Sequence, residues 1–268
     1  MTLATWPFVL DEWTTLETLH KTGKSLARVG DGEGALARGA AQVREPANPA
    51  LAEELRQVLR HPHPRCLVGI PRLIPDTPKH RNWLARIDSM LPFLSPDVQY
   101  GSAFLTRPDS APAIRTPIYA RRLVALWSGK HVALVAEPET AILRLVQRTL
   151  EGGSLSHVLC PHRQTYAQID RIEREVLAAH ADIALLSCGP AATCLSNRLV
   201  HRGLQAIDIG SAGGFLLHEL FGAANTLRVF ALGFPRTGTT SLAAALTQAG
   251  LQVAHQHPRW LHPTELTG

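Results

Sequence analysis

The chain has 268 residues, of which 45% are hydrophobic and 18% charged, and its formal net charge is +5. This length and composition are typical of a globular protein with one large domain, or one domain and part of another. No apolar run reaches the roughly 18 residues that a membrane-spanning helix needs. The basic residues form no dense block and no aromatic-interleaved stripe. The sequence therefore predicts neither a transmembrane segment nor a nucleic-acid partner.

The N-terminal stretch and the cysteines indicate the compartment. The opening residues, "MTLATWPFVLDEW", lack the basic segment and the cleavage site of a secretory signal. The four cysteines include no C-x-x-C pair and no histidine at zinc-finger spacing. We therefore expect Cys66, Cys160, Cys188 and Cys194 to be reduced, mostly buried thiols in a cytoplasmic protein.

Apolar runs alternate with amphipathic segments from Ser25 onward. Strands are predicted at 25–29, 66–70, 131–137, 156–160, 182–187 and 204–209. Helices are predicted at 138–150 and 168–180, where apolar residues recur at three- and four-residue steps. The Pro-rich stretch 71–118 interrupts this alternation, and we expect long loops around one helix at 81–91. Together these patterns predict a Rossmann-like α/β fold, with a mostly parallel, doubly wound sheet and helices on both faces.

Two carboxylates follow the first predicted strand, in the segment Gly30-Asp31-Gly32-Glu33. Ligands of open α/β sheets bind just past the carboxyl ends of strands, and Gly32 allows a turn that aims Asp31 and Glu33 at one point. Such hard oxygen ligands suit Mg²⁺ or Mn²⁺ bound together with substrate phosphates. The structural alternative makes Asp31 an N-cap and Glu33 a first-turn acid favoured by the helix dipole.

A second candidate turn lies in "LLSCGPAATCLSNRL", after a later strand. Gly189 allows a sharp turn there, and Pro190 suits the first turn of a helix. The exposed backbone N–H groups of Ala191, Ala192 and Thr193 would then form an anion site at the helix N-terminus. The plain alternative is a βα turn without a ligand.

The last predicted strand is followed by "AIDIGSAGGF", in which Asp208 and Gly210 lie just past the strand end. The glycines allow either the close approach of a ligand or close packing of a helix on the sheet. Arg107 in "FLTRPDS" and Arg163 in "CPHRQTY" are candidate phosphate-binding cations, and each could equally be a surface charge.

Six segments, taken in order, resemble the bacterial GT-D-type glycosyltransferases. They are "SLARVGDGE", "SAFLTRP", "LWSGKHVALVAEPET", "VLCPHRQTYAQIDRI", "LLSCGPAATCLSNRLVHRG" and "LQAIDIG", and the resemblance covers roughly residues 15–220. It implies an enzyme that transfers a sugar from a nucleotide sugar, typically UDP-glucose, to a glycan acceptor. It also implies that Asp31 and Glu33 bind a divalent metal, Mn²⁺ or Mg²⁺, beside the donor diphosphate.

Together with the strand-end patterns above, the resemblance gives expected roles to a larger set of residues. Asp31, Glu33 and Arg107 are expected to act in catalysis. The expected donor-binding residues are Arg28, Gly30, Gly32, Arg163, Gly189, Pro190, Ala191, Ala192, Thr193, Asp208 and Ser211. Two departures bear on donor or acceptor choice: Ser211 stands where the family often has His, and Gln164 and Thr165 replace the usual Asn after "CP". No residue stands out as a catalytic base, so the stereochemical course stays open. The oligomeric state also stays open.

The tail, "RVFALGFPRTGTTSLAAALTQAGLQVAH", predicts a strand, a loop, a helix and a strand. Its G-x-x-x-x-G spacing is that of a P-loop, but Thr239 stands where a nucleotide triphosphatase has Lys. It resembles the 5′-phosphosulfate loop of sulfotransferases, with the phosphate-cradling positions taken by Arg236, Thr237, Gly238, Thr239 and Thr240. We expect a GT-D-like domain at 1–225 and an incomplete sulfotransferase-like segment at 226–268, without sulfotransferase activity.

Two other functions stay open at this point. The tail alone favours a sulfotransferase-related protein that uses a phosphosulfate donor. The departure at Ser211 favours a module that binds a nucleotide or a glycan without turnover.

Overall fold

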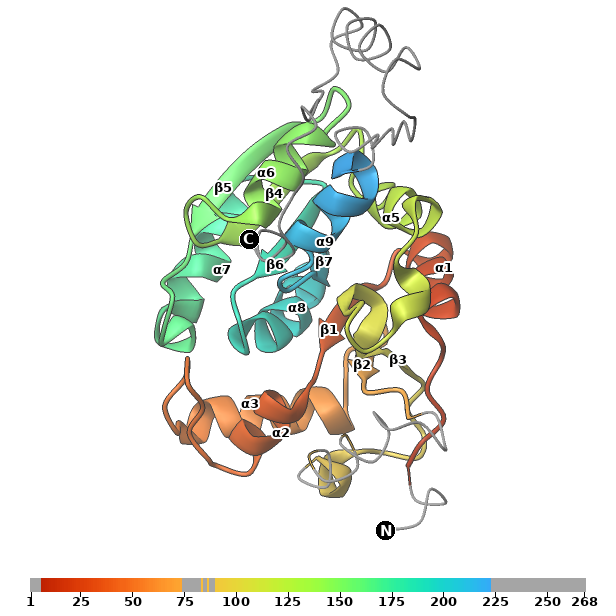
Figure 1. Ribbon diagram of the computed structural model, residues 1–268. Coiled ribbons are helices and arrows are strands. Elements are labelled where there is room, and N and C mark those ends of the chain that lie inside the picture. The colour runs from red at the N-terminus through yellow and green to blue at the C-terminus, as the bar shows by residue number, and fades with distance from the viewer. Residues whose placement is uncertain (1–5, 74–82, 84–85, 87–89, 223–268) are drawn as a thin grey trace, which may run out of the picture. The chain divides into compact units, whose positions relative to one another are not determined.

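The computed structural model describes residues 6–73, 83, 86 and 90–222 (Figure 1). The chain divides into two units, Met1–Ala223 and Ala224–Gly268, and the described residues belong to the first. The predicted tail elements and the positions Arg236–Thr240 lie outside the described residues, as does most of the predicted helix at 81–91. The predicted domain boundary after residue 225 stays a prediction.

In the described part of the chain, seven strands form one parallel sheet. They are β1 (Ser25–Arg28), β2 (Cys66–Ile70), β3 (Tyr100–Ser102), β4 (His131–Ala136), β5 (Ser154–Leu159), β6 (Ile183–Ser187) and β7 (Gln205–Asp208). The strand order is β3-β2-β1-β7-β6-β4-β5. Side chains alternate between two cores, since Leu26 packs on one face of the sheet and its neighbour Ala27 on the other. The predicted α/β class is confirmed.

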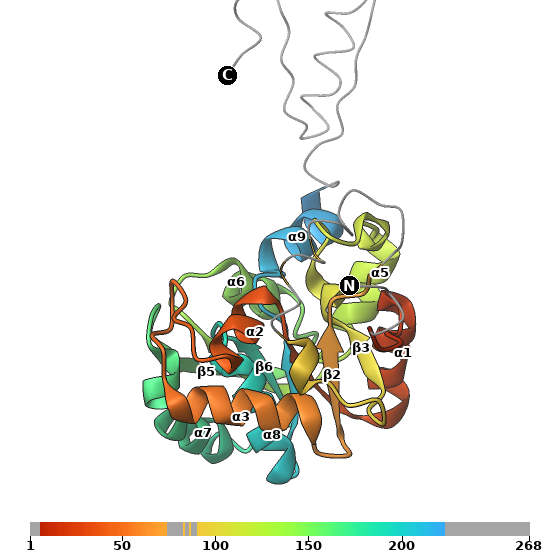
Figure 2. The ribbon, with the colours of Figure 1, turned by 90° about the horizontal axis from the view of Figure 1, so that it is seen from below.

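Helices cover both faces of the sheet (Figure 2). The α-helices are α1 (Glu12–Thr22), α2 (Asp31–Ala37), α3 (Pro49–Arg60), α5 (Pro117–Val124), α6 (Ala141–Arg148), α7 (Ile169–Ala178), α8 (Ala191–His201) and α9 (Gly213–Leu217). One core joins apolar residues of α1, α5, α6 and α9, and the opposite core joins those of α3, α7 and α8. This is the doubly wound arrangement predicted from the alternating pattern.

Several elements differ from the predictions, among them α3, for which no helix was predicted. The stretch 71–118, expected to form loops around a helix, contains β3 and the start of α5. β3 has only three residues, Tyr-Gly-Ser, so it offers no apolar run to identify it. Helix α1 precedes the first predicted strand and was not predicted, although Asp11 caps it by accepting a hydrogen bond from the Thr14 N–H. It ends at Gly23, whose φ of 62° is left-handed.

The structure also bears on the cysteines and on membrane-spanning helices. All four cysteines are free and buried, as expected for thiols that serve packing. Among the described residues, no helix has both the length and the apolar character needed to cross a membrane.

Helix α9 depends on a glycine at its contact with α6. A Cβ on Gly213 would collide with the backbone N of Ile142, whereas a Cβ on Gly214 would meet nothing within 4 Å. We expect Gly213→Ala to lower the free energy of unfolding by about 1–3 kcal/mol, because backbone atoms cannot move aside as a side chain can. Gly214→Ala should be neutral or stabilising, by up to about 1 kcal/mol. Urea denaturation of the two variants measures the difference, and equal effects would contradict this packing.

Candidate active site

A pocket of about 250 Å³ opens at the carboxyl ends of β1, β3, β6 and β7. Its lining residues are Arg28, Gly30, Asp31, Gly32, Glu33, Trp83, Ala103, Phe104, Arg107, Gly189, Asp208 and Gly210. The helices that follow the adjacent strands β1 and β7 contribute to opposite cores, α2 to one and α9 to the other. Such a divergence leaves a crevice at the carboxyl edge, which is where ligands of doubly wound folds bind.

The start of α2 places two acidic side chains in the pocket, one mostly buried and one half-exposed. Gly30 is the N-cap, and its backbone N–H donates a 2.7 Å hydrogen bond to Glu33 Oε2. Burial raises the pKa of Glu33, and this hydrogen bond partly opposes the rise. The Asp31 side chain is 46% exposed, and its Oδ2 lies 3.6 Å from Nη1 of Arg86. The alternative in which Asp31 caps the helix is wrong, because Gly30 holds that position, whereas Glu33 does take a capping role.

The carboxylates of the pocket are candidate ligands for a divalent metal. Within the described ranges, no group of three or more His, Cys, Asp or Glu side chains is arranged to hold a metal ion. The pocket lining contains three carboxylates. Asp208 is paired with Arg28, which leaves Asp31 and Glu33, two residues apart in the first turn of α2. Mg²⁺ in nucleotide sites is commonly held by one or two carboxylates, with water and substrate phosphates as the remaining ligands. The residues fit a metal that binds together with a phosphorylated ligand.

The buried ion pair of Arg28 and Asp208 lies beside these acids. Arg28 Nε donates to the Asp208 backbone oxygen at 2.9 Å, and Nη2 lies 3.0 Å from Asp208 Oδ1. Nη1 donates to Thr106 Oγ1 at 2.5 Å, which ties β1 and β7 to the turn after β3. Burial raises the pKa of Asp208, and the guanidinium offsets part of that rise. Arg28 is thus fixed in one orientation, with its charge facing the pocket.

Gly210 leaves room for this guanidinium. Its φ of 52° is left-handed, and a Cβ there would collide with Arg28 Nη2. Gly203 is a matched control, because its φ of 84° is also left-handed but a Cβ would meet nothing within 4 Å.

Alanine at either glycine is expected to lower the free energy of unfolding by about 1–3 kcal/mol through backbone strain. Only Gly210→Ala should also weaken binding of a phosphorylated ligand, because only this change displaces Arg28. Thermal unfolding and calorimetric titration with UDP separate the two effects. A Gly210→Ala protein that binds UDP as tightly as Gly203→Ala would contradict the role of Arg28.

Aromatic and cationic side chains form a second wall of the pocket. The rings of Trp83 and Phe104 lie 5.2 Å apart between centroids, inclined at 52°. Arg107 donates to both carboxylate oxygens of Asp109, from Nε at 2.9 Å and Nη2 at 2.8 Å. This pairing lowers the pKa of Asp109 to about 2 and raises the pKa of Arg107. The Arg107 guanidinium therefore stays charged and held at the rim of the pocket.

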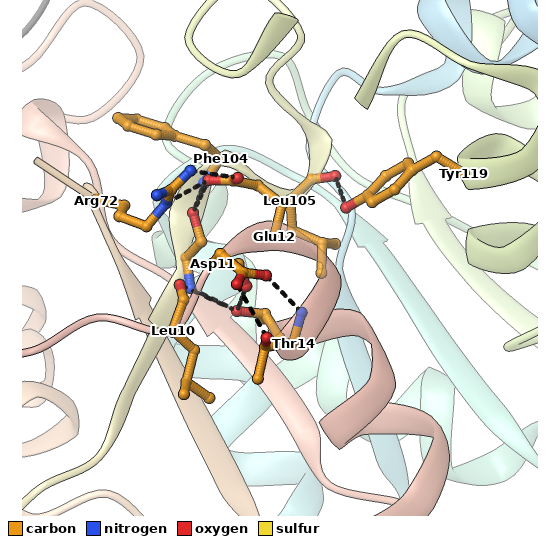
Figure 3. Close-up of polar contacts among 10 residues, drawn as sticks. Leu10, Asp11, Glu12, Thr14, Arg72, Phe104, Leu105 and Tyr119 are labelled. Atoms are coloured by element: carbon orange, nitrogen blue, oxygen red, sulfur yellow. Dashed lines mark hydrogen bonds and ion pairs between the residues drawn. The ribbon is translucent and has the colours of Figure 1, made fainter. Parts of the chain in front are cut away.

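A buried network outside the pocket supports this wall (Figure 3). Glu12, at the start of α1, accepts hydrogen bonds from Arg72 Nε at 3.1 Å and Nη2 at 2.8 Å. It also accepts one at 2.8 Å from Ser102 Oγ, which in turn accepts a hydrogen bond from the Phe104 N–H. Tyr119 donates to the Leu105 carbonyl at 2.8 Å. The segment 103–107 is thus anchored on α1 through Ser102 of β3, and on α5.

The turn after β6 brings only one of its predicted residues into the pocket. Gly189 lines the pocket and has the expected left-handed φ, of 65°. The prediction that the backbone N–H groups of Ala191, Ala192 and Thr193 are free to bind an anion is wrong for two of them. The N–H of Ala192 donates to the Gly189 carbonyl, and the N–H of Thr193 donates to the Pro190 carbonyl. The Thr193 hydroxyl donates to the Arg28 carbonyl at 2.6 Å. The buried residues Ala191, Ala192 and Thr193 thus support the turn behind Gly189 and Arg28.

Two other predicted donor-binding residues lie outside the pocket lining. Arg163 is exposed in the loop after β5, at the far edge of the sheet from β3. Ser211 is exposed directly after Gly210. The pocket also includes residues that were not predicted, Trp83, Ala103 and Phe104. Ala103 and Phe104 stand beside Arg107 in the segment "SAFLTRP", whereas Trp83 stands in the predicted helix at 81–91.

A polar pocket at the carboxyl edge of a parallel sheet is typical of proteins that bind phosphorylated ligands. A sequence model of the family described as glycosyltransferase GT-D fold matches residues 26–213, and the chain belongs to this family. A sulfotransferase-domain model matches residues 228–266, which confirms the resemblance of the tail. The matched tail lies outside the described residues.

Known relatives agree with this assignment. A probable glycosyl transferase from Streptococcus gordonii is 29% identical over an alignment of 212 residues, and the match covers 73% of this chain and 30% of the relative. A glycosyltransferase structure from Streptococcus sanguinis matches 85% of this chain and 91% of its own, with a TM-score of 0.67 and 23% identity. The structure of a highly conserved domain with a distinct glycosyltransferase fold matches 94% of this chain and 93% of its own, with a TM-score of 0.70 and 22% identity. At such identities the structural likeness shows the fold.

Proposed function

We propose that this glycosyltransferase moves a sugar from a nucleotide sugar of the UDP-glucose type to a glycan acceptor, with help from a divalent metal. The observation that carries the proposal is the convergence of Asp31, Glu33, Arg28 and Arg107 on one pocket at the strand ends. A donor diphosphate is an anion that pairs with a metal ion and with guanidinium groups, and this pocket supplies groups for both.

In this proposal Asp31 and Glu33 hold the metal, Mn²⁺ or Mg²⁺, against the donor diphosphate. The metal would neutralise charge that develops on the leaving nucleoside diphosphate. Arg107, held by Asp109 at the rim, adds a fixed positive charge near the same group. The Arg28–Asp208 pair borders the pocket, and its geometry is fixed from β1, β7 and Thr106. Its guanidinium adds positive charge beside the phosphate that carries the sugar.

Turnover tests the proposal directly. The protein is incubated with Mn²⁺ and each of several UDP-sugars and GDP-sugars, with a panel of glycan acceptors, and the release of nucleoside diphosphate is measured. We expect acceptor-dependent release from one UDP-sugar, and its loss in EDTA. Release that is equally fast in EDTA would contradict the metal. Tight donor binding without release, across the panel, would favour a non-catalytic nucleotide- or glycan-binding module.

The match at 228–266 supports a second, narrower candidate, a sulfotransferase-related protein that uses a phosphosulfate donor. The match includes the loop positions Arg236–Thr240, which are expected to bind a 5′-phosphosulfate. Tight binding of adenosine 3′,5′-bisphosphate would favour this candidate, and its absence would favour the glycosyltransferase alone.

A further inference from the structure

A second polar cluster lies along the same edge of the sheet, outside the pocket lining. It consists of Arg44, from the loop between α2 and α3, Glu137, directly after β4, and His162, shortly after β5. Arg44 Nη1 lies 3.2 Å from Glu137 Oε1, and His162 Nδ1 lies 2.7 Å from Glu137 Oε2. The side chains are 48%, 27% and 55% exposed, respectively, so a ligand in solution can reach all three.

The cluster is continuous with the pocket through Gly189. This residue lines the pocket, and the position of a Cβ on it lies 3.9 Å from Cδ of Arg44. The loop that carries Arg44 reaches the β5 side of the sheet in both views (Figures 1 and 2), where the Gln164 N–H donates to the Arg44 carbonyl at 2.7 Å. The cluster and the pocket therefore border one stretch of the carboxyl edge, from β1 and β7 past β6 to β4 and β5.

A nucleotide sugar is an elongated molecule with chemically different ends. Its diphosphate suits the metal-binding acids and arginines, whereas its ribose offers hydroxyl groups that need acceptors. Glu137 is the carboxylate at the far end of this edge, and an acidic residue that binds ribose hydroxyls is a recurrent feature of doubly wound nucleotide sites. Arg44 and His162 hold its two oxygens, one each, which fixes the orientation of the carboxylate.

We propose that the Arg44–Glu137–His162 cluster binds the nucleoside end of the donor, with Glu137 accepting hydrogen bonds from the ribose. This inference rests on the proposed nucleotide-sugar function. It gives the donor a direction: the sugar lies at the Arg28–Asp208 end of the edge, and the nucleoside crosses Gly189 toward β4 and β5.

The test is calorimetric titration of three ligands, UDP, 2′-deoxy-UDP and inorganic pyrophosphate, into the full chain in the presence of Mn²⁺. Glu137→Gln is expected to weaken UDP binding about tenfold, since a hydrogen bond to a charged group is lost. It should leave pyrophosphate binding unchanged and remove the preference for UDP over 2′-deoxy-UDP. Glu175→Gln is the matched control, because Glu175 forms an exposed ion pair with Arg171 on α7, and it should change none of the three.

Different results contradict this inference and the proposed nucleotide-sugar function. A Glu137→Gln protein that binds UDP like the wild type would overturn the inference alone. Equal weakening of all three ligands would also overturn it, because Glu137 would then only fasten the loop of Arg44 to the sheet. A wild-type protein that binds pyrophosphate but neither UDP nor 2′-deoxy-UDP would overturn the proposed function and this inference with it.

Discussion

Asp31→Asn is expected to weaken Mn²⁺-dependent UDP binding about 10- to 100-fold, because a neutral amide replaces the more exposed of the two carboxylates proposed to bind the metal. The fold should be unaffected, since Asp31 is half-exposed and its ion pair with Arg86 lies at the surface. Calorimetric titration of wild-type and variant protein in the presence of Mn²⁺ gives the ratio of dissociation constants.

The control for this change is Asp97→Asn, which alters an exposed acid in the turn before β3 and should leave UDP binding unchanged. A variant at Asp31 that retains wild-type affinity in Mn²⁺ would contradict the metal site. Asp31 would then be a first-turn acid that only favours the start of α2.

Glu12→Ala is expected to lower the free energy of unfolding by about 3–5 kcal/mol, because it leaves the Arg72 charge without its partner in a mostly buried setting. Ser102 Oγ would lose its acceptor at the same time. Glu12→Gln should cost less, since an amide oxygen can still accept from Ser102. Urea denaturation, with equal slopes for each variant, measures these differences.

The exposed ion pair of Arg171 and Glu175 is the control for the Glu12 variants. Glu175→Ala removes the partner of Arg171 on α7, where we expect a change of about 0–1 kcal/mol. If Glu12→Ala were as mild as Glu175→Ala, the network beneath Phe104 would not anchor the wall of the pocket.

The fold was predictable from the sequence because its strands are near-continuous apolar runs. β4 and β6 are buried along almost their whole length, and such runs between amphipathic helices leave few alternatives to a parallel sheet. β3 was not predictable, because a strand of three residues with a central glycine has no period to detect. Its place in the sheet depends on pairing with β2 and on the anchor from Glu12, which are tertiary contacts.

The site was predictable at its strand ends and much less so on its walls. Asp31, Glu33, Asp208 and Gly189 all follow apolar runs directly, so the rule for open α/β sheets places them at one edge. Phe104 and Trp83 come from the Pro-rich stretch, where no pattern indicates which side chains turn toward the pocket. The amides of Ala192 and Thr193 were misjudged because the turn satisfies them internally, which spacing alone does not reveal.

The most direct measurement of the central claim is calorimetric titration of UDP into the wild-type chain, once with Mn²⁺ and once with EDTA. We predict saturable one-site binding in Mn²⁺ that is at least about tenfold weaker in EDTA, because the metal supplies much of the attraction for the diphosphate. Binding of equal strength in both conditions, or no binding in either, would contradict a metal-assisted donor site at Asp31 and Glu33.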